Sequence, residues 1–170
     1  PAATLARLRL WAEDGGSELL DLERSHRAIG ISRYFEQPAP LQATWNKLIH
    51  FVLAANELAS ERAARRQYQA TQLGALNGET CLLELLPLPA PSTNTWPYAT
   101  WSASIPWLCD RRAYRRHLLD ARVEALRSRI AAHRPRTVLF YGRAEQARWI
   151  EIAACSFAPV ANHAALVGRR

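Results

Sequence analysis

Apolar residues recur along this chain at a spacing that predicts amphipathic helices. From Leu41 to about Ala59 they lie three or four positions apart, which places them on one helical face. The same spacing predicts helices over 113–133 and 145–154. In the helix over 113–133 the apolar stripe leaves the arginines on the outside. The stripe consists of Leu119, Val123, Leu126 and Ile130.

The first 75 residues are predicted to be mostly helical. A helix beginning at Ala2 ends before two glycines, Gly15 and Gly16. Residues 60–72 are rich in alanine and charge, which predicts a helix end or an exposed extension. The apolar stripe of the first helix consists of Leu5, Leu8 and Trp11.

Two shorter apolar runs predict buried strands. Residues 81–86 run into closely spaced prolines that begin at Pro87, and residues 137–141 end at Gly142. Since predicted helices alternate with them, we expect parallel strands joined by a right-handed crossover. The expected fold class is α/β, a three-layer α/β/α arrangement whose short central, mainly parallel sheet is flanked by helices.

We expect residues 1–170 to form a single domain. Within it, residues 1–75 make a mostly helical front half, and residues 80–170 make a strand–helix–strand half that carries the site. The chain contains no methionine and starts at Pro1. We therefore expect it to be a piece of a longer protein or a processed form.

Polar and aromatic side chains follow the first predicted strand. Open parallel sheets bind ligands at the carboxyl ends of their strands, so we expect these side chains to line a cleft there. The alternative is that Trp96 and Tyr98 simply pack beneath a proline-stiffened loop. The candidate cleft residues of this loop are Pro87, Ser92, Asn94, Trp96 and Tyr98.

The chain has a net charge of +7, and the excess lies late in the sequence. Residues 101–170 hold 13 basic and 5 acidic residues. A basic face of this kind favours nucleic-acid binding, with DNA as the expected partner. The alternative is a basic face that only meets solvent. The clustered arginines are Arg111, Arg112, Arg115, Arg116, Arg122, Arg127 and Arg129.

Cysteine usage and the lack of familiar motifs exclude several classes of site. Cys81, Cys109 and Cys155 are odd in number and far apart, which indicates neither a disulfide framework nor a metal-ligand spacing and favours a reduced, cytoplasmic setting. The seven glycines form no phosphate-binding or dinucleotide-binding loop. We expect no metal and no cofactor. No apolar run reaches the ~20 residues that span a bilayer, so we expect no membrane association.

The order of these segments resembles the uracil-DNA glycosylase superfamily. The similarity covers roughly residues 80–170: a strand running into the proline-rich loop, a basic helix, and a strand that ends in Phe140-Tyr141-Gly142. It implies that Val160 to His163 form a last short strand. His163 would then stabilise charge on a departing base, and an aromatic ring would stack on the flipped base. The candidate rings are Trp96, Tyr98 and Tyr141.

Two departures from that superfamily bear on function. Its glycine-rich first motif, which carries the water-activating residue, has no match in this chain. Glu84 stands where the base-reading asparagine is expected, and an ionised carboxylate only accepts hydrogen bonds. The resemblance thus implies either a protein that hydrolyses the N-glycosidic bond of a flipped base in DNA, or a non-catalytic module that binds nucleic acid or protein. A generic α/β enzyme acting on a small molecule is the third alternative.

Overall fold

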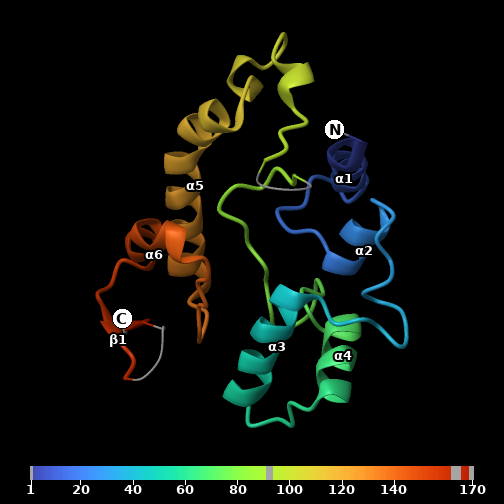
Figure 1. Ribbon diagram of the computed structural model, residues 1–170, viewed down its shortest axis with the longest axis vertical. Helices are drawn as coiled ribbons and strands as arrows, with labels where there is room; N and C mark the ends of the chain where they lie inside the picture. Colours follow the sequence, from blue (N-terminus) through green and yellow to red (C-terminus); the bar gives the residue numbers. More distant parts are fainter. Residues whose placement is uncertain (1, 91–93, 162–165, 169–170) are drawn as a thin grey trace. The chain divides into compact units, whose positions relative to one another are not determined.

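The computed structural model describes residues 2–90, 94–161 and 166–168, and these are mostly helical (Figure 1). The chain divides between Leu82 and Leu83 into two compact units. We refer to Pro1–Leu82 as the first unit and to Leu83–Arg170 as the second unit, and describe each by itself. None of the described helices combines the length and the apolar character that a membrane crossing requires.

The expected three-layer α/β/α fold is wrong. The strands of the described residues are β1 (Phe157–Pro159) and β2 (Leu166–Gly168), which pair antiparallel. Residues 81–86 and 137–141, expected to be parallel strands, are irregular and form no sheet ladder. A short apolar run signals burial without showing what buries it. Here Leu85, Leu86 and Phe140 of these runs pack against helices of the second unit, whereas Leu83, Val138 and Leu139 stay exposed.

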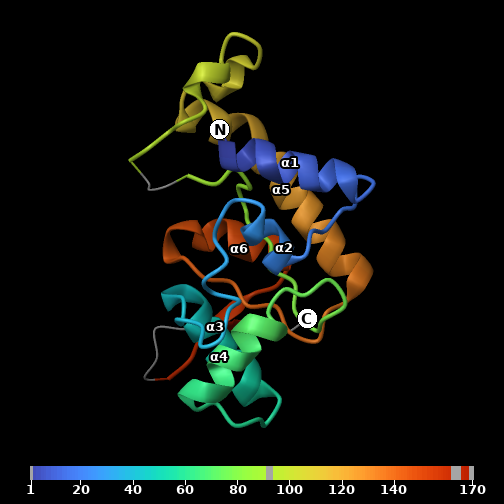
Figure 2. The same ribbon diagram turned by 90° about the vertical axis from the view of Figure 1, so that its right-hand side faces the viewer.

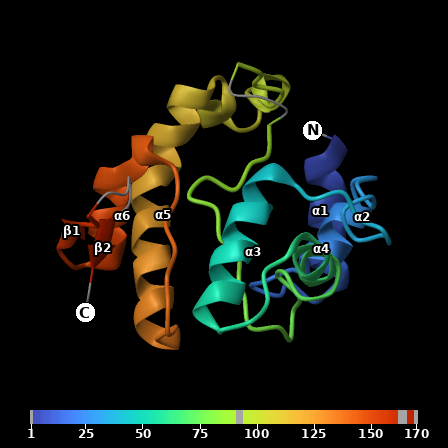
Figure 3. The same ribbon diagram turned by 60° about the horizontal axis from the view of Figure 1, so that its bottom comes forward.

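The first unit consists of four helices. The core between α3 and α4 contains Ile49, which is fully buried, together with Leu53, Tyr68 and Leu73. These two helices lie side by side (Figure 3). The expected helix over Leu41–Ala59 is present as α3, whereas residues 60–72 form a separate packed helix rather than an extension. The four are α1 (Ala2–Glu13), α2 (Leu22–Arg27), α3 (Ala43–Ala55) and α4 (Arg62–Thr71).

A buried glutamine anchors the polar groups of the first unit. Gln69 is 1% exposed, and its Oε1 accepts a hydrogen bond from the Gln42 backbone N–H. Its Nε2 donates to the backbone carbonyls of Tyr34 and Pro40, both at 2.9 Å. Gln42 in turn caps α3, because its side chain accepts from the Trp45 N–H, a group that the helix leaves unpaired. Neutral groups therefore hold the 34–42 loop against α4.

The second unit is built on one long helix, α5. Asp110 caps its start by accepting from the Ala113 N–H at 2.7 Å. Arg134 closes its end in the left-handed conformation, with φ of 45°. Helices expected over 113–133 and 145–154 are confirmed as α5 and α6. The elements are η1 (Ala99–Trp101), η2 (Pro106–Leu108), α5 (Arg111–His133), η3 (Arg143–Glu145) and α6 (Gln146–Ala153).

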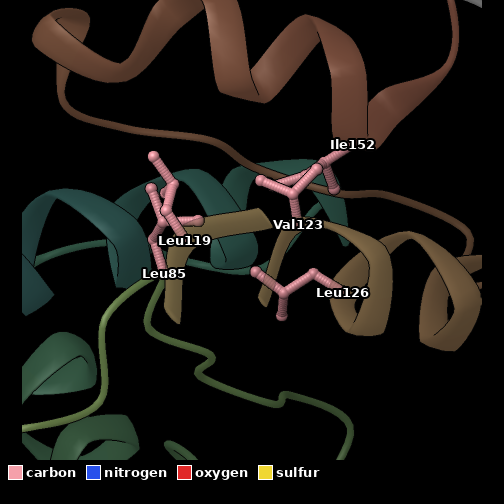
Figure 4. Packing of buried hydrophobic residues seen from close by; sticks show 5 residues of the cluster. All are labelled: Leu85, Leu119, Val123, Leu126 and Ile152. Carbon is pink, nitrogen blue, oxygen red and sulfur yellow. The ribbon is translucent and has the colours of Figure 1, made fainter. Parts of the chain in front are cut away.

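The core of the second unit confirms the predicted stripe on α5. Leu119, Val123 and Leu126 are buried against Ile152 of α6 and against Leu85 from the irregular segment before α5 (Figure 4). Val123 and Ile152 point toward one another across the two helices. The irregular runs therefore do supply core residues, but they pack onto a helix instead of joining a sheet.

Candidate nucleic-acid interface

An aromatic loop, residues 94–110, leads into the first turn of α5 (Figure 2). Its rings form a cluster in which Trp96 lies 5.0 Å from both Tyr98 and Tyr114, measured between ring centroids. Tyr98 is 1% exposed, and Trp96 packs against the same cluster. Trp96 and Tyr98 therefore pack beneath the loop, as the alternative to a ligand-binding cleft supposed.

The polar tips of this cluster fix the chain around it. Tyr98 donates its hydroxyl hydrogen to the Pro89 carbonyl at 2.5 Å, and the Tyr114 hydroxyl accepts from the Leu88 N–H at 3.1 Å. Trp96 Nε1 donates to the Leu108 carbonyl at 2.8 Å. Burial raises the pKa of Tyr114, so its phenol stays neutral. Side-chain hydrogen bonds thus hold this part of the backbone in place, whereas in the expected fold hydrogen bonds between strands would do so.

Three of the predicted arginines hold the second unit together. Arg115 makes a bidentate pair with Glu145, at 2.7 and 2.6 Å, and this lowers the pKa of the Glu145 carboxyl. Arg122 donates to the backbone carbonyl of Glu84 at 2.8 Å and to that of Leu85 at 3.4 Å. Arg111 donates to the Thr95 carbonyl at 2.8 Å. The expectation that the stripe leaves all arginines outside is therefore wrong: chain segments packed along α5 use these three.

Other arginines of the second unit remain open to solvent. Arg127 pairs with Glu124 on its own helix, and Arg129 is partly buried. The guanidinium groups of five exposed arginines make no hydrogen bond and no close ion pair within the described part of the chain, although Arg116 interacts electrostatically with Asp110. The five arginines are Arg112, Arg116, Arg134, Arg136 and Arg143. The last three fall outside the predicted cluster, and the only signal for them in the sequence was their place in segments that flank a predicted helix.

The net charge is confined to the second unit. Residues 83–170 contain 13 arginines and 6 acidic residues, whereas residues 1–82 contain 9 basic and 9 acidic residues. Arg112 and Arg116 lie in the first two turns of α5. Because Glu145 bonds Arg115, η3 and its Arg143 lie along the same part of α5. Three of the open arginines, Arg112, Arg116 and Arg143, thus lie near the start of α5, which the aromatic loop precedes. The other two, Arg134 and Arg136, follow the end of α5.

The remaining predicted site residues do not form a described cleft. Glu84, Pro87 and Asn94 are exposed, and Tyr141 is 61% exposed. The backbone carbonyl of Glu84 accepts a hydrogen bond from Arg122. Two further candidates, Ser92 and His163, lie outside the described residues. The strand expected from Val160 to His163 is not seen in its described part, since β1 ends at Pro159.

Sequence reasoning missed one stacked pair of aromatic rings, Trp107 and His117. Trp107 of η2 lies 4.5 Å from His117 of α5, and the two rings are inclined by only 12°. Trp107 is partly exposed and His117 is exposed. No periodic element was predicted around Trp107, so nothing in the sequence indicated which ring it would meet.

Small-molecule and metal chemistry find little support in the described residues. A cavity of about 20 Å³ in the first unit, bordered by Asp21, Phe35 and Gln69, has room for about one water. No group of three or more His, Cys, Asp or Glu side chains among the described residues is placed to hold a metal ion. Comparisons of the chain with protein-family models, with curated proteins and with solved structures give no match.

Proposed function

We propose that the second unit binds nucleic acid, DNA in the first instance, by contacting phosphates through its exposed arginines, and that it does so without catalysing a reaction. The observation that carries this proposal is the set of five exposed arginines whose guanidinium groups make no hydrogen bond or close ion pair among the described residues. The fold uses Arg111, Arg115 and Arg122 for its own cohesion. The open five have no such structural role.

Guanidinium chemistry favours phosphate as the ligand. Arginine stays charged at physiological pH and offers a planar fork that matches phosphate oxygens. Like charges near one another on a small unit repel, and a polyanion relieves that repulsion while releasing its own counterions. Arg112 and Arg116 lie beside the rigid aromatic loop, so their backbones are held in place before a ligand arrives.

Base excision does not form part of this proposal. The resemblance that implied it places the reacting base at the edge of a parallel sheet, and the described residues contain no parallel strands. Tyr98, a candidate stacking ring, is buried in the core. The cavity described in the first unit does not support a small-molecule enzyme either, because it has room for about one water, whereas ligand pockets typically measure about 300–1,000 Å³.

A salt titration with a matched control tests the proposal. Fluorescence anisotropy of a labelled DNA oligonucleotide measures the association constant. The logarithm of this constant should fall linearly with the logarithm of the salt concentration, with a slope of about −0.9 for each phosphate contacted on a duplex. Charge reversal of Arg112 and Arg116 (R112E/R116E) should weaken binding to all sequences alike and flatten that slope, because phosphate contacts carry no base information.

The control reverses Arg9 and Arg62, two exposed arginines of the neutral first unit. R9E/R62E changes the net charge of the chain by the same amount and should leave affinity nearly unchanged. Equal losses in the two double variants would show a diffuse charge effect and contradict a site on the second unit. Absence of binding by the unaltered chain at low salt would refute the proposal outright.

A further inference from the structure

We infer that Trp107, supported by His117, is a stacking platform for an unpaired base, so that the nucleic acid bound beside Arg112 and Arg116 is single-stranded. The inference rests on the proposed function and names the form of its ligand. Single-strand binders commonly combine basic side chains along the backbone path with aromatic rings on which successive bases stack. The second unit brings both features to the start of α5.

The indole of Trp107 is supported from the helix side. His117 lies at 4.5 Å with an angle of 12° between the rings, and Tyr114 lies at 6.1 Å with an angle of 23°. These two residues are three positions apart on α5, so they project from the same side of the helix. Trp107 nevertheless stays partly exposed. A ring backed by two others and still open to solvent can accept a further flat partner.

The backbone on either side of Trp107 is fixed. Pro106 begins η2 with a restricted φ, and Leu108 is 2% exposed in the aromatic cluster. The Leu108 carbonyl also accepts the indole N–H of Trp96. Since its neighbours are already held, Trp107 loses little conformational freedom when it binds a base.

The polar atom of Trp107 distinguishes it from Trp96 of the same loop. Trp96 Nε1 is occupied by the Leu108 carbonyl at 2.8 Å. Trp107 Nε1 makes no hydrogen bond within the described part of the chain, and it is not among the buried unpaired polar atoms there. It therefore reaches solvent and can donate to a base or phosphate oxygen.

The charges around the platform favour a phosphate backbone. Arg116 precedes His117 on α5, and Arg112 lies one turn before Arg116, both exposed and without a hydrogen bond or close ion pair to the guanidinium within the described residues. Two acidic residues lie near these arginines: Asp110, which caps the start of α5 and interacts electrostatically with Arg116, and Asp120, whose carboxylate lies 3.8 Å from the Arg148 guanidinium. Bases inside a duplex are covered by their neighbours, whereas a single strand can place a base face on the indole while its phosphates meet the arginines.

Affinity for single-stranded and duplex DNA of the same composition, measured at one salt concentration, tests the inference. We expect tighter binding to the single strand. W107L should lower single-strand affinity about tenfold, as expected for loss of one stacked base, and leave duplex affinity unchanged. W107F keeps a flat ring and should retain most of the affinity. W11L, at a tryptophan that is 45% exposed in the first unit, is the control and should change nothing.

A second measurement holds even where W107L fails to fold. A single-stranded oligonucleotide that carries iodouracil should photocross-link the unaltered chain at Trp107 or His117. Cross-links only elsewhere, or equal binding of single strand and duplex, would overturn the platform and leave phosphate binding intact. Loss of binding to both forms at low salt would instead refute the proposed function.

Discussion

The two units of this chain differ in the side chains that anchor their irregular segments. In the first unit the anchor is the neutral amide of Gln69, which is buried and satisfies three backbone groups. In the second unit neutral tyrosine and tryptophan contacts are joined by the charged guanidiniums of Arg115 and Arg122, which reach a carboxylate and two backbone carbonyls. Buried amides add no net charge to the first unit, whereas the second unit keeps an excess of cations that it does not neutralise.

The difference shows that a basic cluster in a sequence is not the same as a basic surface. Arg115 and Arg122 are seven residues apart, which brings them to the same side of α5, where other segments pack. Arg116 is adjacent in sequence to Arg115 but projects about 100° further around the helix, and it is exposed. Helical geometry thus places the arginines of one cluster on two sides of α5, one where other segments pack and one that faces solvent.

The largest effect should follow from breaking the neutral anchor. Gln69→Leu leaves the Gln42 N–H and the Tyr34 and Pro40 carbonyls without their partner, at a cost of about 1–3 kcal/mol for each group that stays buried. We expect the free energy of unfolding, measured in urea, to fall by about 3 kcal/mol. Gln67→Leu, at an exposed position of the same helix, should change it by less than about 0.5 kcal/mol. Similar values for the two variants would contradict the role of Gln69.

A smaller loss should follow from removing one tyrosine hydroxyl in the second unit. Tyr114→Phe keeps the ring but leaves the Leu88 N–H without its acceptor, which should destabilise the chain by about 1–2 kcal/mol. Thermal unfolding measures the difference. Tyr141→Phe, at a ring that is 61% exposed, is the matched control and should be neutral. Equal melting temperatures for both variants would mean that water satisfies Leu88 as well as Tyr114 does.

The charged anchor should contribute less than the neutral one. A double-mutant cycle with R115M and E145Q should give a coupling free energy of about 1 kcal/mol, because the pair is bidentate but its side chains are 38% and 25% exposed. Salt should reduce this coupling. Arg148 and Asp120, at 3.8 Å and with Asp120 86% exposed, should give no measurable coupling. If both cycles give the same value, the contrast between embedded and exposed arginines does not hold.

The smallest effect is a dependence of the first unit on pH. His26 packs 5.6 Å from Phe35 and 5.1 Å from Trp45, and its Nδ1–H donates to the Leu22 carbonyl at 2.8 Å. Burial lowers the pKa of His26 below the ordinary 6.5, more strongly than this hydrogen bond raises it, and the charge of Arg7 adds a further lowering.

Folded chains therefore bind fewer protons than unfolded ones in this range. The stability that neutral His26 contributes is fully present above pH 6.5, decreases below it, and is lost as the pH falls through the folded pKa. Titration of the His26 ring by NMR, together with unfolding at pH 7.5 and at acid pH, measures this. His26→Gln should flatten the dependence on pH, and a ring that titrates above 6.5 would refute the assigned direction.

The sequence was sufficient for elements whose pattern is long and periodic. Leu119, Val123 and Leu126 are buried as their spacing predicts, and α5 ends just before Pro135, which disfavours helix in the residue that precedes it. A run of 23 residues offers several repeats of one spacing, so its buried face is well determined. Shorter helices, including α4, are identified chiefly by contacts that the sequence does not display.

The two predicted strands are absent because the local preference of a segment for the strand conformation does not determine which segment it packs against. Leu85 and Phe140 belong to runs of strand-forming residues, but in the structure both pack against α5 or beside its core. The site was predictable only in part for the same reason. The clustering of basic residues in the sequence was enough to predict that Arg112 and Arg116 are exposed cations. Arg115 belongs to the same cluster but is paired with Glu145, which lies 30 residues away in the sequence. The Trp107–His117 stack likewise depends on how a loop folds back onto a helix.

The contact of Arg122 with two backbone carbonyls limits which residues can replace it as the sequence diverges. One guanidinium spans the carbonyls of Glu84 and Leu85, a geometry that the single ammonium of lysine cannot reproduce. At Arg112 and Arg116 only positive charge is needed, so lysine should be accepted there. In a library of variants selected for folding, arginine should persist at position 122 while lysine and arginine exchange freely at 112 and 116. The frequency of that exchange would map, position by position, which cations belong to the architecture and which face the solvent.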